Sequence, residues 1–334
     1  MLTATHLSRA YADVRAVRDV SFTLDAGRIM ALVGESGSGK STLLNLLAGL
    51  TDADAGEVHL NGRRVPGPGE VLVPGHPQLR LVPQEYQLMP NVSVRENIAF
   101  ALRYYERSYR DFRVDELLRL CWLTEVQHRI PKQISGGEKQ RTAIARAVAD
   151  KPSDGQSAVL LLDEPFSHLD LPNRLIVRDL LFDLVQHDRV ACLFVTHDST
   201  DVLSIADTLG ILHAGKLIQL GSPIDVYRRP ATVYAARMTG MATILKAKHL
   251  PLLGLPPADD ANALFCLRPE QVVMADTGAP GTVRAVFFRG SFSEVEIELS
   301  RYVCVRLLTT RDDLRAGQRV GVRVATESVW RLKG

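Results

Sequence analysis

Short apolar runs alternate with amphipathic stretches along the first two-thirds of the chain. The apolar runs predict β-strands at residues 29–33, 79–82, 159–162 and 191–195. The amphipathic stretches predict helices at residues 41–50, 115–121, 138–149 and 173–186. This succession of strand and helix is typical of an α/β domain with a mostly parallel sheet. Two segments interrupt it: the proline-rich 63–78 predicts an irregular loop, and the polar 151–157 predicts a surface turn.

After about residue 238 the pattern becomes that of β-structure. Prolines and an Ala-Asp-Asp-Ala run predict a connector within 251–261. Beyond it, apolar side chains recur at every second position in four runs: Val283, Ala285 and Phe287; Val295, Ile297 and Leu299; Val303, Val305 and Leu307; and Val320, Val322 and Val324. Turns are predicted at 289–291 and 315–317. We therefore expect an α/β domain at 1–237 and a small all-β barrel or sandwich at 238–334.

Composition excludes several classes of protein. Lys and Arg number 40 and Asp and Glu 38, a net charge of +2 that argues against nucleic-acid binding through a basic surface. The four cysteines form no Cys-x-x-Cys pair, which argues against a disulfide scaffold or zinc ribbon and favours a reducing compartment. The first residues do not resemble a signal peptide, and apolar runs stay far below the roughly 20 residues that span a bilayer. We expect no membrane span in the chain itself.

A glycine-rich segment lies between the first buried strand and the helix after it. Residues 34–41 read Gly-Glu-Ser-Gly-Ser-Gly-Lys-Ser and fit the phosphate-loop pattern GxxxxGK[ST]. Glycines let backbone N–H groups approach phosphate oxygens, and the helix dipole adds positive potential. We assign Lys40 to the β- and γ-phosphates, Ser41 to Mg²⁺ and Thr42 to the phosphates. The alternative, a flexible Gly/Ser turn, does not account for this position between strand and helix. The predicted nucleotide-binding residues here are Gly34, Glu35, Ser36, Gly37, Ser38, Gly39, Lys40, Ser41 and Thr42.

Two carboxylates follow the buried strand at 159–162. Asp163 and Glu164 lie where parallel strands of α/β folds bind their ligands. We expect Asp163 to reach Mg²⁺ through its water shell and Glu164 to polarise the water that attacks the γ-phosphate. Taken alone, the pair fits equally well a solvated strand end; the phosphate loop upstream favours the catalytic interpretation.

A second glycine-rich helix start occurs at Ser135-Gly136-Gly137-Glu138. Ser135 and Glu138 have the spacing of a capping box, so this segment fits a well-capped helix. Capping does not explain two consecutive glycines, which are costly in a helix. They fit a second site where a phosphate approaches a helix start.

These motifs together resemble the ATP-binding cassette (ABC) ATPases. The segment 135–140 resembles the signature motif of that family, with Ile134 at its first position where Leu is usual. The resemblance implies a head-to-tail homodimer in which each ATP lies between the phosphate loop of one chain and the signature of the other. Ser135, Gly136, Gly137 and Glu138 would then bind ATP in trans, and a lone monomer would hydrolyse ATP poorly.

The resemblance implies roles for further residues. Tyr11 matches the aromatic that stacks on adenine, and Gln84 matches the glutamine that joins the Mg²⁺ shell and senses the membrane partner. Asp170, in Ser-His-Leu-Asp, matches the acid of the loop that crosses the dimer interface, although His168 stands where a small residue is more common. His197 matches the histidine that contacts the γ-phosphate. Without the family context, Tyr11 fits an ordinary surface tyrosine and His197 a structural histidine.

The resemblance also extends to the helical subdomain and to the second domain. Residues 91–97 are similar to the stretch that enters the helical subdomain, expected at about 91–150. Residues 267–270, Leu-Arg-Pro-Glu, with the alternating strands after them, resemble the TOBE domain of importer ATPases for ferric iron, polyamine, sulfate, molybdate or sugar uptake. The alternative is a β domain that only strengthens the homodimer. Clustered aromatics with a basic groove are lacking, which disfavours nucleic-acid binding, and Cys266 and Cys304 have no nearby ligand partners for a metal.

The expected function is that of the ATP-hydrolysing subunit of an ABC importer, with ATP and Mg²⁺ as cofactors. Its expected partners are a second copy, transmembrane permease subunits and an extracytoplasmic substrate-binding protein, at the cytoplasmic face of the inner membrane. The expected dock for the permease lies around 91–120, where Tyr104, Tyr105 and Tyr109 are plausible contacts. One alternative is an ABC-type ATPase that acts on nucleic acid or ribosomes, a class that usually has two cassettes or a coiled coil. Another is a regulatory binder without turnover, which Glu164 and His197 disfavour.

Overall fold

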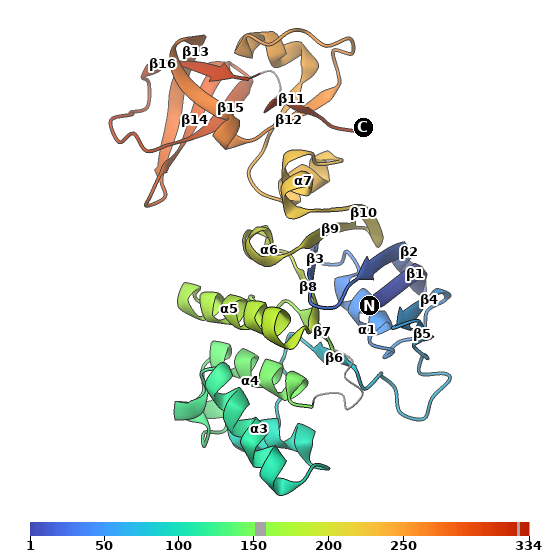
Figure 1. Cartoon of the computed structure of the whole chain (residues 1–334). Coiled ribbons are helices and arrows are strands. Elements are labelled where there is room, and N and C mark those ends of the chain that lie inside the picture. Colours follow the sequence, from blue (N-terminus) through green and yellow to red (C-terminus); the bar gives the residue numbers. More distant parts are fainter. Residues whose placement is uncertain (151–157, 326–327, 334) are drawn as a thin grey trace. The chain divides into compact units, whose positions relative to one another are not determined.

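The computed structural model describes residues 1–150, 158–325 and 328–333, and its contacts divide the chain into two compact units, Met1–Pro223 and Ile224–Gly334 (Figure 1). The turn predicted at 151–157 lies outside the described residues. The division falls after the first residue of α7 (Pro223–Arg228), whereas the boundary expected at 237/238 falls at the end of α8 (Val233–Met238). The limits of the functional domains stay a prediction.

A six-stranded sheet forms the centre of the first unit. All four strands predicted in this part of the chain are confirmed, and adjacent strands are parallel except at the β10–β9 edge. Strands β3 and β8 are buried along their whole length, which explains their unbroken apolar sequences. In spatial order the strands are β10 (Lys216–Gly221), β9 (Thr208–His213), β3 (Ile29–Val33), β8 (Ala191–Thr196), β7 (Val159–Asp163) and β6 (Leu79–Val82).

An antiparallel sheet that the sequence did not reveal packs over helix α1 (Lys40–Leu47). Its strands are β2 (Val14–Leu24), β1 (Leu2–Tyr11), β4 (Ala55–Leu60) and β5 (Arg63–Arg64). The pairing of β1 with β2 shifts register between Ala4 and Leu7 and again around Arg9, and such bulges obscure a period of two. Leucines of α1 share one hydrophobic core with residues of both sheets, so α1 lies between them.

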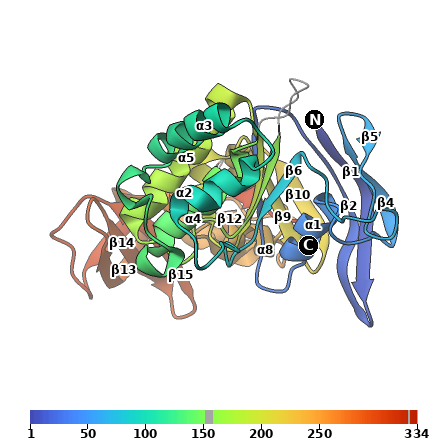
Figure 2. The ribbon, with the colours of Figure 1, turned by 90° about the horizontal axis from the view of Figure 1, so that it is seen from below.

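The helices of the first unit other than α1 gather on the other side of the six-stranded sheet (Figure 2). Between β6 and β7 the chain forms α2 (Val94–Ala99), α3 (Arg107–Leu120) and α4 (Gly136–Val148), and α5 (Leu171–Asp188) and α6 (Ser199–Ile205) follow later. Helix α3 begins eight residues before the predicted start at 115. Its first turns expose Tyr109 and Phe112, so their apolar residues do not mark a buried face. Within the described residues, none of the helices combines the length and apolar character needed to cross a membrane.

The second unit contains the predicted β domain. Strands β11 (Thr243–Lys246), β12 (Leu264–Leu267) and β17 (Trp330–Arg331) form one sheet. The second sheet has the order β15 (Val303–Thr309), β14 (Ser293–Ser300), β13 (Val272–Phe288) and β16 (Arg319–Val324), all antiparallel. The predicted turns at 289–291 and 315–317 are confirmed, each with a backbone hydrogen bond and a glycine at positive φ.

Two details of this unit differ from the sequence predictions. The predicted connector begins within a 3₁₀ helix, Ala247–Leu253, which with Leu255 contributes to the core of the β domain. In β13 the alternation breaks at a bulge after Val283, so that Val286 packs on the core while Phe287 is 44% exposed. A one-residue slip of this kind moves side chains to the opposite face.

Candidate functional site

The glycine-rich loop connects the carboxyl end of β3 to helix α1. Gly39 has φ 99°, and a Cβ at this position would lie 2.0 Å from the carbonyl oxygen of Ala16 in β2. Only glycine is compatible with both the left-handed conformation and this close approach. The loop is also tied to its neighbours, because the Gly34 N–H donates to Thr196 O (3.2 Å) and the Gly215 N–H donates to Ser38 O (3.0 Å). The loop is therefore held at the carboxyl ends of adjacent strands.

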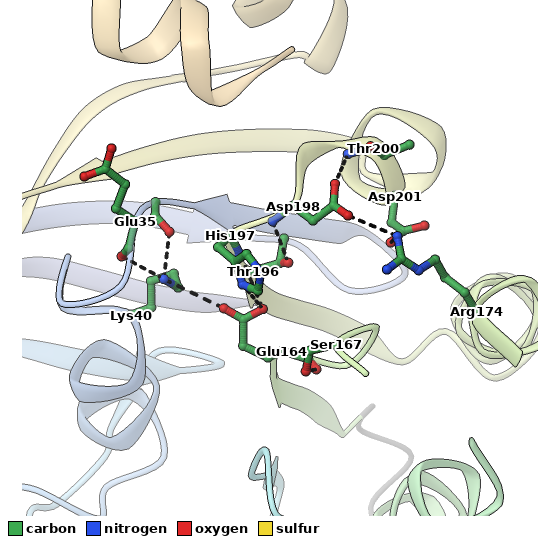
Figure 3. A network of polar contacts seen from close by, with 11 residues as sticks. Glu35, Lys40, Glu164, Ser167, Arg174, Thr196, His197, Asp198, Thr200 and Asp201 are labelled. Carbon is green, nitrogen blue, oxygen red and sulfur yellow. Dashed lines mark hydrogen bonds and ion pairs between the residues drawn. The ribbon is translucent and has the colours of Figure 1, made fainter. Parts of the chain in front are cut away.

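Lys40 extends back over this loop from the first turn of α1 (Figure 3). Its Nζ donates to the carbonyl oxygens of Gly34 (2.7 Å) and Glu35 (3.0 Å) and lies 3.8 Å from Oε1 of Glu164. Burial lowers the pKa of the Lys40 ammonium, and the carboxylates of Glu164 and Asp163 oppose that shift. The arrangement places one cation between the loop and the two acids at the end of β7, Asp163 and Glu164.

Glu164 and His197 face each other from the ends of neighbouring strands. Glu164 has φ 52°, and its N–H donates to Val195 O (2.9 Å), which fixes the sharp turn after β7. Its Oε2 lies 2.9 Å from Nδ1 of His197, the residue that follows β8. The Glu164 side chain is only 9% exposed, whereas that of His197 is 62% exposed. The pair thus has one member directed inward and one open to a ligand.

Asp163 and Ser41 are joined by a hydrogen bond near the Lys40 ammonium. Burial raises the pKa of Asp163; a hydrogen bond with Ser41 opposes that shift, and the neighbouring Glu164 adds to it. A hydroxyl and a carboxylate suit Mg²⁺, which usually takes few protein ligands and completes its shell with phosphate oxygens and water. The donor set therefore fits Mg²⁺ bound together with a phosphate ligand. Gln84 lies instead on an exposed groove of about 550 Å³ that Lys139 and His168 also line.

The predicted second anion site begins helix α4. Ser135 accepts a hydrogen bond from the Glu138 N–H (3.3 Å), and the Glu138 carboxylate accepts one from the Ser135 N–H (2.7 Å), which is the predicted capping box. The two glycines have different surroundings. Gly136 is exposed, with nothing within 4 Å of its added Cβ. Gly137 is buried, and its Cβ would lie 2.4 Å from Oδ1 of Asn173, so packing within the chain itself accounts for that glycine.

Asp170 lies beside this helix start. Its carboxylate caps α5 by accepting from the N–H (3.1 Å) and the Nδ2 (2.7 Å) of Asn173. His168, two residues earlier, has φ 60°, a left-handed conformation that favours glycine. Thus the structure groups the predicted residues into two sets. The phosphate loop, Asp163, Glu164 and His197 form one set, and Ser135–Glu138 with Asp170 form the other.

Tyr11 ends strand β1 and is 46% exposed. The guanidinium of Arg9 lies 4.9 Å from the centre of its ring. The next strand of the same hairpin carries Ala16, which contacts Gly39 of the phosphate loop. A stacking role for Tyr11 stays a prediction.

Sequence reasoning missed two arginines that support these sets. Arg174 of α5 contacts Asp198 (3.0 Å) and Asp201 (3.3 Å) of the α6 segment, directly after His197. Asp198 also caps α6 by accepting a hydrogen bond from the Thr200 N–H. An aspartate directly before a helix is a cap signal that the sequence does contain.

The second missed residue is Arg146 of α4. Its guanidinium donates to the carbonyl oxygens of Tyr86 (3.1 Å) and Gln87 (2.8 Å), which follow Gln84 and have φ 62° and 46°. These contacts join segments about 60 residues apart, and no local pattern predicts them.

Two family models match the chain. The model described as ABC transporter matches residues 17–167, and the model described as TOBE domain matches residues 265–332. The first match includes the phosphate loop, the helix start at Ser135 and the acids at the end of β7. The second covers most of the β domain.

Curated relatives and solved structures agree with these matches. The sulfate/thiosulfate import ATP-binding protein of Synechococcus elongatus is 38% identical over 85% of this chain and 80% of its own length. The Fe(3+) ions import ATP-binding protein of Pectobacterium atrosepticum is 37% identical over 90% of this chain and 89% of its own. A dimeric post-hydrolysis ATP-binding cassette bound to ADP and phosphate matches with a TM-score of 0.58 and 26% identity, over 66% of this chain and 98% of that one.

Proposed function

The chain belongs to the ABC transporter family of ATP-binding proteins, and from this premise we propose that it is the ATP-hydrolysing subunit of an importer. The observation that carries the proposal is the convergence of Lys40, Glu164 and His197 at the carboxyl ends of β3, β7 and β8. Relatives whose names describe import ATP-binding proteins for sulfate, Fe(3+) and spermidine/putrescine support the direction of transport.

The residues at this convergence divide the work of hydrolysis. Backbone N–H groups of the phosphate loop and the Lys40 ammonium bind the β- and γ-phosphates. Glu164 orients a water molecule in line with the γ-phosphate and accepts its proton as the water oxygen bonds to the γ-phosphorus, while the bond from that phosphorus to the β–γ bridging oxygen breaks and ADP leaves with the bonding electrons. His197 holds the Glu164 carboxylate through Nδ1 and presents its exposed ring to the γ-phosphate. Ser41 and, through the water shell of the ion, Asp163 would hold Mg²⁺, whose charge would offset that of the phosphate oxygens.

The set around Ser135 completes the site of a second copy. Exposed Ser135 and Gly136 start a capped helix, and Asp170 lies beside them. We assign Ser135, Gly136, Gly137, Glu138 and Asp170 to the ATP bound by the partner chain. The dimeric structure of a similar cassette supports this assembly.

Transmembrane permease subunits and an extracytoplasmic substrate-binding protein are the proposed further partners, with the chain on the cytoplasmic side of the membrane. Aromatic side chains around 100–112 provide the proposed dock. Tyr104 is 86% exposed and Phe112 63% exposed, whereas the Tyr105 hydroxyl donates to Asp150. We therefore assign contact with the permease to Tyr104 and Phe112 rather than Tyr105.

The Glu164→Gln variant tests the proposal. It keeps the shape of the side chain but removes the proton acceptor, so ATP should bind without being hydrolysed and dimers should accumulate. Light scattering on a sizing column with ATP and Mg²⁺ measures the mass, and phosphate release measures turnover. Glu125→Gln, an exposed glutamate outside the site, is the matched control and should behave as wild type.

Two outcomes would overturn the proposal. One is absence of ATP-dependent phosphate release from the wild-type chain assembled with its permease. The other is a Glu164→Gln chain that stays monomeric with ATP while the wild type turns over. Lys40→Ala, which should lose nucleotide binding, shows whether any dimer depends on ATP.

A further inference from the structure

Asn173 contacts both segments that, in the proposed function, bind the ATP of the partner chain. It lies in the first turn of α5, three residues after the cap Asp170. Its Oδ1 accepts from Arg141 of α4 (2.9 Å), and its Nδ2 donates to the Asp170 carboxylate (2.7 Å). Its side chain also packs against Gly137, where an added Cβ would lie 2.4 Å from Oδ1.

The orientation of this amide is fixed by its partners. Arg141 has only donors, so the group that faces it must be the amide oxygen. Asp170 as a carboxylate has only acceptors, so the group that faces it must be the amide nitrogen. Arg141 is itself held, because it is 5% exposed and its Nε donates to Cys121 O (2.9 Å). The Asn173 side chain therefore connects a buried point of α4 to the carboxylate of Asp170.

We infer that Asn173 is a positioning residue that holds Asp170 in a fixed place relative to the Ser135–Gly137 helix start. This inference rests on the proposed function, in which both segments contact the ATP of the partner chain. An interface that closes on one ligand gains affinity when its two contacting segments are already in place, because less conformational entropy is lost on binding. Asn173 supplies this preorganisation without touching the nucleotide.

Side chains of similar size cannot replace both contacts. Leucine has neither the acceptor for Arg141 nor the donor for Asp170. Aspartate keeps the acceptor for Arg141 but sets a second carboxylate against Asp170. Both changes leave the phosphate loop untouched, so ATP binding by the monomer should not change.

Asn173→Leu in the Glu164→Gln background tests the inference. We expect dimerisation at saturating ATP and Mg²⁺, measured by sedimentation, to weaken about ten-fold, which is the order of one lost hydrogen bond to a charged group. Binding of a fluorescent ATP analogue to the monomer should stay within about two-fold. Arg178→Ala, which removes an exposed ion pair with Asp179 on the same helix, is the matched control for α5 stability and should leave dimerisation unchanged. Unchanged dimerisation of Asn173→Leu would overturn the inference.

A second experiment needs no dimer and keeps the two proposals distinguishable. Alanine normally stabilises a helix relative to glycine, but Gly137→Ala should lower the melting temperature because its Cβ meets Asn173. In an Asn173→Gly background the same change should be neutral or stabilising. If Gly137→Ala is equally destabilising in both backgrounds, the packing contact is not what constrains this glycine, and the inference fails. If the Glu164→Gln parent itself does not dimerise, the proposed function fails. The melting temperatures of Gly137→Ala in the two backgrounds still test the packing of Gly137 against Asn173.

Discussion

The carboxylate of Glu164 is held by His197 at two points. Its Oε2 lies 2.9 Å from Nδ1 of His197 and accepts from the backbone N–H of the same residue at 3.4 Å. Glu164 is nearly buried and stands at positive φ, so its carboxylate has few alternative positions. The histidine therefore orients the proposed base as well as facing the site.

Replacing His197 by Ala should lower kcat for ATP hydrolysis by about 10²-fold or more, since one positioned acid–base contact contributes that order of rate. Binding of ATP to the monomer should change little, because the phosphate loop and Lys40 are retained. Phosphate release and nucleotide titration measure the two effects separately. A His197→Ala enzyme with wild-type kcat would show that Glu164 does not depend on this contact.

Burial of Asp163 carries a cost in the ligand-free protein. Because burial raises its pKa above the ordinary 3.8, the folded state keeps the proton to higher pH than the unfolded state. The stabilising effect of that proton is complete below the ordinary pKa and is lost as pH rises through the raised value. Asp163→Asn removes the charge, so without ligand its melting temperature at neutral pH should exceed that of wild type.

The pH dependence provides the control for this prediction. The advantage of Asp163→Asn should shrink as the pH is lowered towards 4 and the wild-type carboxyl gains its proton. ATP hydrolysis should be impaired in the variant because a ligand proposed for Mg²⁺ is lost. An advantage that is the same at pH 4 and pH 7 would mean that the stability gain does not come from this titration.

Local patterns predicted most of the fold. Buried strands such as β3 and β8 are continuous apolar runs. The motifs at Gly34 and Ser135 are contiguous in sequence, so they can be recognised in a single sequence. The resemblance to ABC ATPases with a TOBE domain is confirmed by the matching family models and relatives. The faces of the bulged strands β1 and β13 were harder to predict, because a bulge moves every later side chain to the opposite face of the sheet.

Contacts over long sequence distances could not be predicted. The glycine pair at 136–137 suggested close approach of a ligand at both positions, but Asn173 occupies the space beside Gly137. An asparagine in the first turn of a helix carries no signal of a partner on another helix. For the same reason the sequence did not reveal the contacts of Arg146 and Arg174.

Arg146 provides the last prediction because it holds the backbone after Gln84. Tyr86 and Gln87 both adopt left-handed conformations, which cost about 1 kcal/mol or more each for residues with a side chain. The Arg146 guanidinium offsets that cost by donating to both carbonyl oxygens. Arg146→Ala should release the segment, and amide hydrogen exchange in 84–88 should accelerate about ten-fold, with a fall in ATP hydrolysis.

Arg146→Lys distinguishes the geometry of the guanidinium from its charge. A single ammonium cannot reproduce the fork with which arginine reaches two adjacent carbonyl groups, so lysine should restore exchange protection only in part. Arg119→Ala, an exposed basic residue on α3, should leave exchange in 84–88 unchanged. If Arg146→Lys protects these amides as well as arginine does, positive charge near the segment is sufficient, and the two hydrogen bonds are not what hold it.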